Sequence, residues 1–383
     1  MDISRRTLLQ RIATGAAVGA GLPALTGAPL SARAIEPVEG NPQVRPVRLH
    51  LSENPYGPSP RVAAALRQDL TGSIKRYPES AAATLQNKVA TTHGVRRAQI
   101  VLGCGSSELL RMAAAVFSGP GRNVVLAHPT FDLMSESARR AGADVIAVPL
   151  RSDHAHDLDA MLAHVDGTVG LVYLCNPNNP TGTLTRRADL ERFVARLPRD
   201  VYVVVDEAYH HYVGGSSDYA SFIDRPVHHP RLIVTRSFST IHGLAGLRVG
   251  YAVASEETAG ALESVRLAGG VNVVAAIAAM TALSDPDHLQ AMTTRNADDR
   301  QEFCNQANAR MLRTIDSHAN FVLLNTGRAG ADMVQHFARH DVLVAGPFSP
   351  FDKQIRVSIG APPEMREFWR VWDLLPPMHH MTM

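Results

Sequence analysis

The stretch Thr235-Arg-Ser-Phe-Ser-Thr-Ile-His-Gly-Leu-Ala-Gly-Leu-Arg-Val-Gly-Tyr251 carries the strongest signal in the chain. Two hydroxyl side chains, Ser237 and Ser239, precede a turn rich in glycine and then Arg248. Small hydroxyls and glycines let a backbone approach a ligand closely, and a guanidinium binds phosphate through two parallel hydrogen bonds. The segment therefore predicts an anion site. The alternative is a plain Ser- and Gly-rich loop before a buried strand at residues 249–253.

Short apolar stretches alternate with longer helical patterns on both sides of this segment. The apolar stretches are Val-rich and continuous, which is typical of strands buried on both faces of a parallel sheet. They cover residues 100–102, 123–127, 144–149, 169–174, 201–205, 231–235 and 249–254. Helical patterns between several of them cover residues 107–117, 131–141, 158–165 and 187–197. The alternation predicts an α/β fold with its ligand beyond the carboxyl ends of the strands.

Changes in composition predict the domain organisation. Residues 1–34 are expected to form a signal peptide, and the Pro-rich residues 35–60 an extended arm. Residues 61–270 contain the alternating pattern and are assigned to a large domain. In residues 271–383 long helices precede short strands, which predicts a smaller α+β domain.

The N-terminus has the features of a twin-arginine signal peptide. Ser4-Arg-Arg-Thr-Leu-Leu9 leads into an uncharged run rich in Ala and Gly, and Ala32-Arg-Ala34 offers small residues for cleavage. This predicts a periplasmic protein, exported folded and free of the membrane after cleavage. A signal anchor or a cytoplasmic location is the alternative, and Pro23 and Pro29 interrupt the run that an anchor would need.

Composition excludes several classes of protein. The chain has 383 residues, 45% of them hydrophobic, which is enough for a large globular core. A formal net charge of +2 without a basic block argues against a nucleic-acid-binding protein. The three cysteines lack the spacing of zinc ligands, so no metal site is predicted.

Further polar motifs follow the predicted strands. Gly103-Cys-Gly-Ser-Ser-Glu108 opens a helix, where free N–H groups, the helix dipole and the hydroxyls of Ser106 and Ser107 favour an anion. Asn176-Pro-Asn-Asn-Pro-Thr-Gly182 is a turn fixed by two prolines, with its amides free to face a ligand. Asp206 ends a buried strand, where a charge needs a partner. A magnesium site would use the Asp206-Glu207 pair, but no phosphate-loop lysine motif accompanies it.

Together these motifs resemble the fold-type I pyridoxal-phosphate (PLP) aminotransferases of class I/II, in the branch that contains histidinol-phosphate aminotransferase. The first segment resembles the family block S-x-S-K-x-x-G-L-A-G-L-R-x-G-Y. The resemblance extends over about residues 46–375. It implies the PLP-transferase type I fold, with a mostly parallel sheet between helices and a smaller α+β C-terminal domain.

The resemblance also implies roles for individual residues around PLP. The ring is expected to stack on Phe131, with Asp206 facing and protonating the pyridine nitrogen. Asn179 and Tyr209 are expected to bond the 3′ oxygen. The phosphate is expected to be held by Gly105, Ser106, Ser107, Ser237, Ser239 and Arg248.

The substrates implied are an amino donor and a 2-oxo acid. Arg356 resembles the arginine that binds the substrate's carboxylate or the phosphate of histidinol phosphate, and Asn54 is expected to contribute to the same subsite. Tyr56 resembles a tyrosine that reaches the neighbouring subunit's cofactor phosphate, which implies a homodimer with shared sites. Relatives that act on histidinol phosphate carry a second arginine before the Arg356 block. Residues 342–347 contain none, which favours an amino acid with a single carboxylate.

One residue departs from the family pattern. Thr240 stands where relatives have the lysine that forms a Schiff base with PLP and then moves protons. Threonine can do neither, so PLP is expected to bind non-covalently. Three explanations stay open: a single-base change in an ordinary aminotransferase, another base such as His242 or Lys353, or a PLP-binding pseudoenzyme. The function predicted is transfer of an amino group between an amino acid, or an amine like histidinol phosphate, and a 2-oxo acid.

Overall fold

The computed structural model describes residues 46–226 and 229–376. The predicted signal peptide and residues 35–45 of the predicted arm lie outside the described residues. Among the residues described, no helix combines the length and the apolar character needed to cross a membrane.

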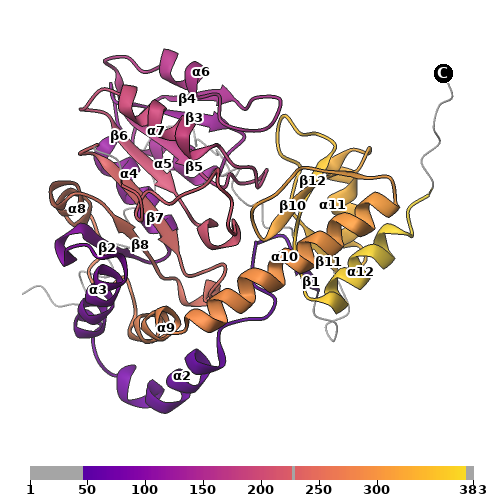
Figure 1. Cartoon of the computed structure of the whole chain (residues 1–383), viewed down its shortest axis with the longest axis horizontal. Coiled ribbons are helices and arrows are strands. Elements are labelled where there is room, and N and C mark those ends of the chain that lie inside the picture. The colour runs from indigo at the N-terminus through magenta and orange to yellow at the C-terminus, as the bar shows by residue number, and fades with distance from the viewer. Residues whose placement is uncertain (1–45, 227–228, 377–383) are drawn as a thin grey trace, which may run out of the picture. The chain divides into compact units, whose positions relative to one another are not determined.

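A seven-stranded sheet forms the centre of the α/β part of the fold (Figure 1). Its strand order is β2-β8-β7-β6-β5-β3-β4. In chain order the strands are β2 Ile100–Gly103, β3 Asn123–His128, β4 Val145–Pro149, β5 Val169–Cys175, β6 Tyr202–Asp206, β7 Leu232–Ser237 and β8 Gly250–Val253. The expected α/β fold with a mostly parallel sheet is confirmed. Only β8 runs antiparallel to its neighbours, because residues 238–249 return the chain from β7 without a crossover helix.

Helices cover both faces of this sheet, as continuous apolar strands require. Side chains alternate along each strand: Val203 and Val205 belong to one core and Val204 to the other. The first core is closed by α2 Pro60–Ser73, α3 Glu79–His93, α6 Leu158–Ala163, α7 Arg187–Arg196 and α9 Val273–Leu283. The second is closed by α4 Ser106–Phe117, α5 Leu133–Arg140 and α8 Glu256–Glu263.

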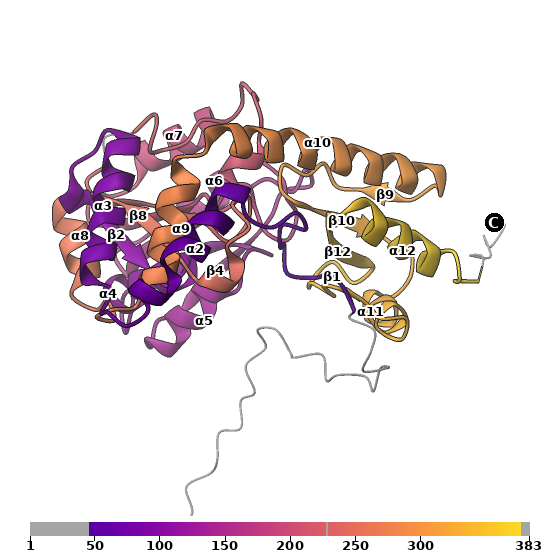
Figure 2. The ribbon, with the colours of Figure 1, turned by 90° about the horizontal axis from the view of Figure 1, so that it is seen from below.

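A third core surrounds a three-stranded antiparallel sheet of order β12-β10-β9. Its elements are α10 Pro286–Ala309, β9 Arg313–Thr314, β10 Phe321–Asn325, α11 Gly330–Ala338, β11 Val342–Val344, β12 Gln354–Ser358 and α12 Pro362–Trp372. Within the segment expected to form an arm, residues 35–60, Val47–Leu49 forms a strand, β1, which pairs in parallel with β11 (Figure 1). β1 also lies close to β12 (Figure 2). Leu49 is buried in the third core, and this burial holds β1 against the C-terminal elements.

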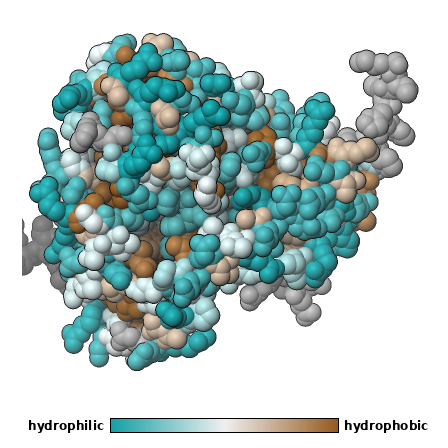
Figure 3. Space-filling model, viewed as in Figure 1, coloured by the Kyte–Doolittle hydropathy of each residue, from teal (hydrophilic) through white to brown (hydrophobic). Residues whose placement is uncertain are grey.

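The face of the molecule shown in Figure 3 is largely hydrophilic, with apolar patches between the hydrophilic regions. Exposed apolar side chains follow α8, which ends at Glu263. The segment that follows leaves Val265 and Leu267 exposed. Ile74 and Tyr77, on the turn after α2, are also exposed. A Cβ atom added to Gly269 would lie 3.6 Å from Cγ of Pro78, which follows Tyr77.

Gly250 marks the closest approach between the sheet and a helix. A Cβ atom at this position would lie 2.5 Å from the amide nitrogen of Ser106 and 2.8 Å from the carbonyl oxygen of Arg236. Both obstacles are backbone atoms, so no side-chain rotation relieves them. The N-terminus of α4 is therefore seated directly on β8, next to the turn that carries the Ser/Gly motif.

Gly250→Ala is expected to lower the free energy of unfolding by about 1–3 kcal/mol, the usual cost of overpacking. The matched control is Gly246→Ala, because a Cβ there meets nothing within 4 Å. Urea unfolding of the two variants beside the wild type measures the difference. Equal stability of both variants would contradict the close seating of α4 on β8.

Candidate active site

The polar motifs meet at the carboxyl edge of the large sheet. Cys175, the last residue of β5, is in register with Asp206 at the end of β6, and Asp206 is in register with Thr235 on β7. Asn179 lies on the turn after β5, and Ser237 ends β7. Neighbouring strands thus bring residues 179, 206 and 237 to the same edge, as parallel topology predicts.

A cradle for an anion forms between α4 and the Ser/Gly turn. Gly105 precedes the first turn of α4, where Ser106 and Ser107 lie, and its φ of +75° suits glycine. The Arg248 guanidinium covers this glycine so closely that it would clash with a Cβ. Free N–H groups of the helix terminus and a guanidinium thus converge here, which fits the phosphate of PLP.

Hydrogen bonds hold the arginine of this cradle in place. Arg248 donates from Nη1 to Ser239 Oγ at 3.1 Å and to the carbonyl of Ala245 at 3.0 Å. The Ser239 amide in turn donates to Ser237 Oγ at 3.0 Å. The structure therefore brings the predicted phosphate residues Gly105, Ser237, Ser239 and Arg248 together.

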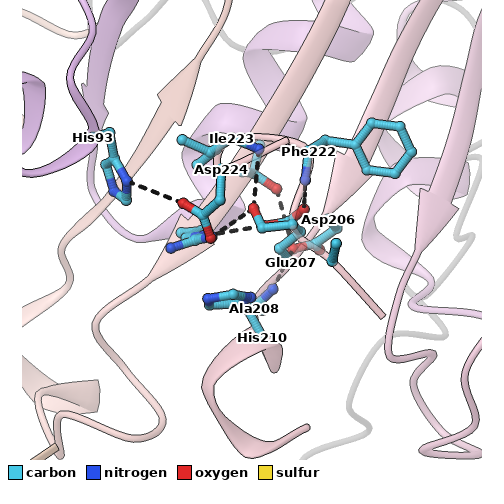
Figure 4. A network of polar contacts seen from close by, with 12 residues as sticks. His93, Asp206, Glu207, Ala208, His210, Phe222, Ile223 and Asp224 are labelled. Atoms are coloured by element: carbon cyan, nitrogen blue, oxygen red, sulfur yellow. Dashed lines mark hydrogen bonds and ion pairs between the residues drawn. The ribbon is translucent and has the colours of Figure 1, made fainter. Parts of the chain in front are cut away.

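Asp206 is a buried carboxylate held by hydrogen-bond donors. Tyr173 donates to Oδ2 at 3.1 Å, and the Thr235 hydroxyl donates to Oδ1 at 3.1 Å. The Ala208 amide also donates to Oδ1, at 3.2 Å (Figure 4). Burial raises its pKa from 3.8 to about 6, although these hydrogen bonds act in the opposite direction. No ion pair joins Asp206 to a cation in the described parts of the chain. A protonated pyridine nitrogen would supply the missing charge.

Tyr173 and Thr235 are partners of Asp206 that the sequence analysis missed. Tyr173 has a hydroxyl inside the otherwise apolar strand β5, and Thr235 on β7 is directly in register with Asp206. That combination of polarity and register was the available signal.

Glu207 faces away from Asp206 into a separate network. Its carboxylate accepts from Phe222 N at 2.8 Å and lies 3.1 Å from Arg236 Nε (Figure 4). Arg236 also approaches Asp224, which lies 3.8 Å from His93. This network links the segment after β6 to β7 and α3, so Asp206 and Glu207 do not form a joint metal site. Across the described residues, no group of three or more His, Cys, Asp or Glu side chains could hold a metal ion.

Tyr209 and Asn179 form the side of the site expected to face the 3′ oxygen. The Asn179 amide nitrogen lies 3.4 Å from the Tyr209 hydroxyl, and Arg356 Nη1 donates to Asn179 Oδ1. Burial raises the pKa of Tyr209 to about 12, so the phenol keeps its proton at neutral pH. The ring of Phe321 supports Tyr209 edge-on at 5.1 Å.

Arg356 is a buried cation whose positive charge has no acidic partner. Its Nη2 donates to the carbonyl of His50 at 2.7 Å, and its side chain lies in no ion pair with a described carboxylate. Its Nε is buried without a hydrogen-bond partner. Burial of the unpaired cation lowers its pKa. An anion bound here would compensate the charge.

Thr240 is buried, and its hydroxyl donates to the carbonyl of Ala208 at 3.1 Å. Among the described residues, no hydrogen bond joins Thr240 to either candidate replacement for a lysine. Lys353 is exposed on the loop before β12. His242 packs between Phe238 and His211 at ring distances of 5.0 and 5.3 Å, and burial lowers its pKa to about 4. The site therefore has a hydroxyl where an amine is expected, and that hydroxyl is held by the backbone.

Three further predicted site residues make different contacts in the single chain. Tyr56 bonds Asp299 of α10 at 2.6 Å. Asn54 donates to the carbonyl of Ile241 at 2.9 Å, which ties the N-terminal segment to the turn that carries Thr240. Phe131 is half-buried against the core beneath α4 and α5. None of these contacts tests the roles that the resemblance implies.

Comparison with known proteins agrees with this geometry. The family model Aminotransferase class I and II matches residues 45–370. Histidinol-phosphate aminotransferase 2 of Pseudomonas aeruginosa is 38% identical, covering 84% of this chain and 87% of its own. Histidinol-phosphate aminotransferase of Brevibacillus brevis is 35% identical, covering 82% and 86%. The crystal structure of histidinol-phosphate aminotransferase from Sinorhizobium meliloti, in complex with pyridoxal-5′-phosphate, has a TM-score of 0.80 at 28% identity, covering 86% and 91%.

The raised pKa of Asp206 gives a pH dependence that can be measured without ligand. The folded state binds the proton more tightly than the unfolded state, so stability is lost as pH rises from 3.8 to about 6. The difference between these values corresponds to about 3 kcal/mol. Asp206→Asn has no such penalty and is expected to gain this amount relative to the wild type between pH 4 and pH 7. Urea unfolding across this range tests it, with the exposed Asp352→Asn as control; equal profiles would contradict the assignment.

Proposed function

The chain belongs to the aminotransferase class I and II family, and we propose that it transfers an amino group between an amino acid and a 2-oxo acid with PLP held non-covalently. One observation carries the proposal. A buried carboxylate, Asp206, and a buried guanidinium, Arg356, both lack an opposite charge among the described residues. Asn179 bonds both Arg356 and Tyr209, and Tyr209 lies close enough to Asp206 for the charge of that carboxylate to raise its pKa. A cationic ring and an anionic substrate would complete this pair of charges.

The residues of the site fit PLP at three separated points. The Gly105–Arg248 cradle would hold the phosphate, Asp206 the ring nitrogen, and Tyr209 with Asn179 the 3′ oxygen. When bound, PLP supplies an electron-withdrawing ring that makes the hydrogen on the substrate's α-carbon acidic. With a pKa of about 6, Asp206 is mostly ionised at neutral pH and can hold the ring nitrogen protonated.

The substrate's carboxylate would be bound by Arg356. To do so, the guanidinium offers its free Nε and can exchange its bond to Asn179 for one to the ligand. Asn179 would then be released toward the 3′ oxygen. Binding of substrate and orientation of the cofactor are thereby coupled through a single amide.

Thr240 sets the rate of proton movement in this proposal. Its hydroxyl donates to the Ala208 carbonyl and can accept a hydrogen bond, but it cannot act as a base near neutral pH. The proposed reaction therefore proceeds without the amine that relatives place here, and turnover should be slow. Binding without any turnover is the competing outcome, and the lysine variant described below separates the two.

We also propose that the protein acts as a homodimer. The exposed apolar residues Ile74, Tyr77, Val265 and Leu267 lie on two segments that approach each other at Pro78 and Gly269. We name these four residues the 74–267 patch and propose that a second copy of the chain covers it. By resemblance, Tyr56 would exchange its bond with Asp299 for the phosphate bound to the partner subunit.

For the N-terminus we propose twin-arginine export to the periplasm, supported by Arg5-Arg6 and the Ala- and Gly-rich run. N-terminal sequencing of the protein from a periplasmic fraction tests this, and a chain that still begins at Met1 would contradict it.

Thr240→Lys is expected to raise the rate of amino transfer by about 10²–10⁴-fold, the usual contribution of general acid–base catalysis. It should also create a bond to PLP that borohydride makes permanent, detected as added intact mass. Thr240→Met is the control, because it extends the side chain without an amine. A lysine variant with neither the added mass nor the higher rate would contradict the placement of position 240 beside PLP.

Leu267→Glu is expected to shift the protein toward monomers, because it places a charge in the 74–267 patch, where Leu267 is 68% exposed. Light scattering over a range of concentrations measures the shift. Leu374→Glu is the matched control, since Leu374 is also exposed but lies after α12. A wild type that remains a monomer at micromolar concentration would refute the dimer.

A further inference from the structure

The surroundings of Arg356 determine more than the binding of a carboxylate. This inference rests on the proposed function and concerns the side chain of the amino donor. The guanidinium lies over two aromatic rings, with its Cζ 5.0 Å from the centre of Phe321 and 5.7 Å from that of Phe348. Phe321 belongs to β10 and also supports Tyr209, whereas Phe348 comes from the loop between β11 and β12. Phe348 is half-buried, and its ring packs against no other aromatic ring of the described residues, unlike the ring of Phe321.

The residue paired with Arg356 across the strands, Ala345, is not a second cation. Ala345 and Arg356 exchange both backbone hydrogen bonds, at 3.0 and 2.8 Å, and form an antiparallel bridge. Residues paired in this way project their side chains to the same face, about 5 Å apart. The position beside the guanidinium is thus occupied by a methyl group.

The nearest other basic groups do not add free positive charge. Arg48 lies close enough to lower the pKa of His50, but it is exposed and paired with Glu53 at 2.8 Å. His50 itself is kept neutral at neutral pH by burial, which lowers its pKa further. Arg356 is therefore the one unpaired cation of this subsite among the described residues, and it can neutralise one anionic group.

Apolar side chains border the same subsite. Leu51 is 50% exposed and follows His50, whose carbonyl accepts from Arg356. Phe351 is bridged to Phe348 across the loop and meets His154 edge-on at 5.3 Å. His154 lies in the segment between β4 and α6. The contact of Phe351 with His154 therefore joins the loop between β11 and β12 to a connecting segment of the large sheet.

We propose that the amino donor is an amino acid with a large, neutral, apolar side chain: Arg356 binds its only anionic group, and Phe348, with Ala345 beside the guanidinium, selects the side chain. A phosphate carries about 1.5–2 negative charges and three acceptor oxygens, and a second carboxylate carries one more charge. Either would leave negative charge unpaired against Phe348 and Ala345, which is unfavourable in a partly buried subsite.

The test uses stable conjugates, so it does not depend on turnover. PLP is reduced onto L-phenylalanine, L-aspartate or histidinol phosphate, and each conjugate is titrated calorimetrically into the full chain, with pyridoxamine 5′-phosphate as reference. The phenylalanine conjugate is expected to bind about tenfold more tightly than the other two, since one uncompensated charge typically costs that much or more. Equal or tighter binding of the aspartate or histidinol-phosphate conjugate would overturn the inference while leaving the cofactor site intact. If pyridoxamine 5′-phosphate and all conjugates fail to bind, the proposed function itself fails.

Variants locate the effect at these residues. Phe348→Ala should lose about tenfold in affinity for the phenylalanine conjugate and Phe348→Leu should retain most of it, with binding of pyridoxamine 5′-phosphate unchanged in both. Ala345→Arg should strengthen binding of the histidinol-phosphate conjugate about tenfold by adding a second cation beside Arg356. Ser349→Arg, on the exposed turn of the same loop, is the matched control and should have no such effect. An unchanged preference in Phe348→Ala would overturn the role of Phe348, even if Ala345→Arg does not fold.

Discussion

Two buried charges without opposite partners shape this protein. Asp206 ends β6 with its pKa raised by burial, and Arg356 lies in β12 with its pKa lowered by burial. In each case the environment disfavours the charged form, yet hydrogen bonds from Tyr173 and Thr235, or to His50 and Asn179, hold the group in a defined position. Such an arrangement costs stability unless a ligand supplies the opposite charges. The fold around it, with a parallel sheet edge and a three-stranded sheet, is what holds the two groups together.

Thr240 changes the chemistry of this site without disturbing its architecture. The cradle at Gly105 and Arg248 and the carboxylate at Asp206 remain organised, while the threonine hydroxyl is satisfied by the Ala208 carbonyl. Binding and orientation of a cofactor depend on the first two features, and proton transfer depends on the third. In the proposed function, cofactor recognition is thus separate from the acid–base role that the family resemblance implies for position 240. The lost function is expected to affect rate far more than affinity.

The central sheet could be predicted from sequence because its strands are buried on both faces and therefore read as continuous Val-rich runs. The site residues at strand ends followed from the same logic. The partners of Asp206 could not be predicted as easily, because Tyr173 and Thr235 contact it only through strand register. The pairing of β1 with β11 joins residues about 295 positions apart, a contact that no local pattern encodes. The apolar surroundings of Arg356 were likewise invisible, since Phe348 reaches it through the path of a loop.

The account depends most directly on whether PLP binds at the Asp206 edge without a covalent bond. An absorbance titration of the purified chain with PLP, followed by borohydride treatment and intact mass measurement, tests this in one series. We predict saturable binding, weakened by Asp206→Asn, with no PLP mass retained after denaturation. A borohydride-stable mass increase would show that another amine forms the bond, and the absence of saturable binding would contradict the cofactor site as a whole.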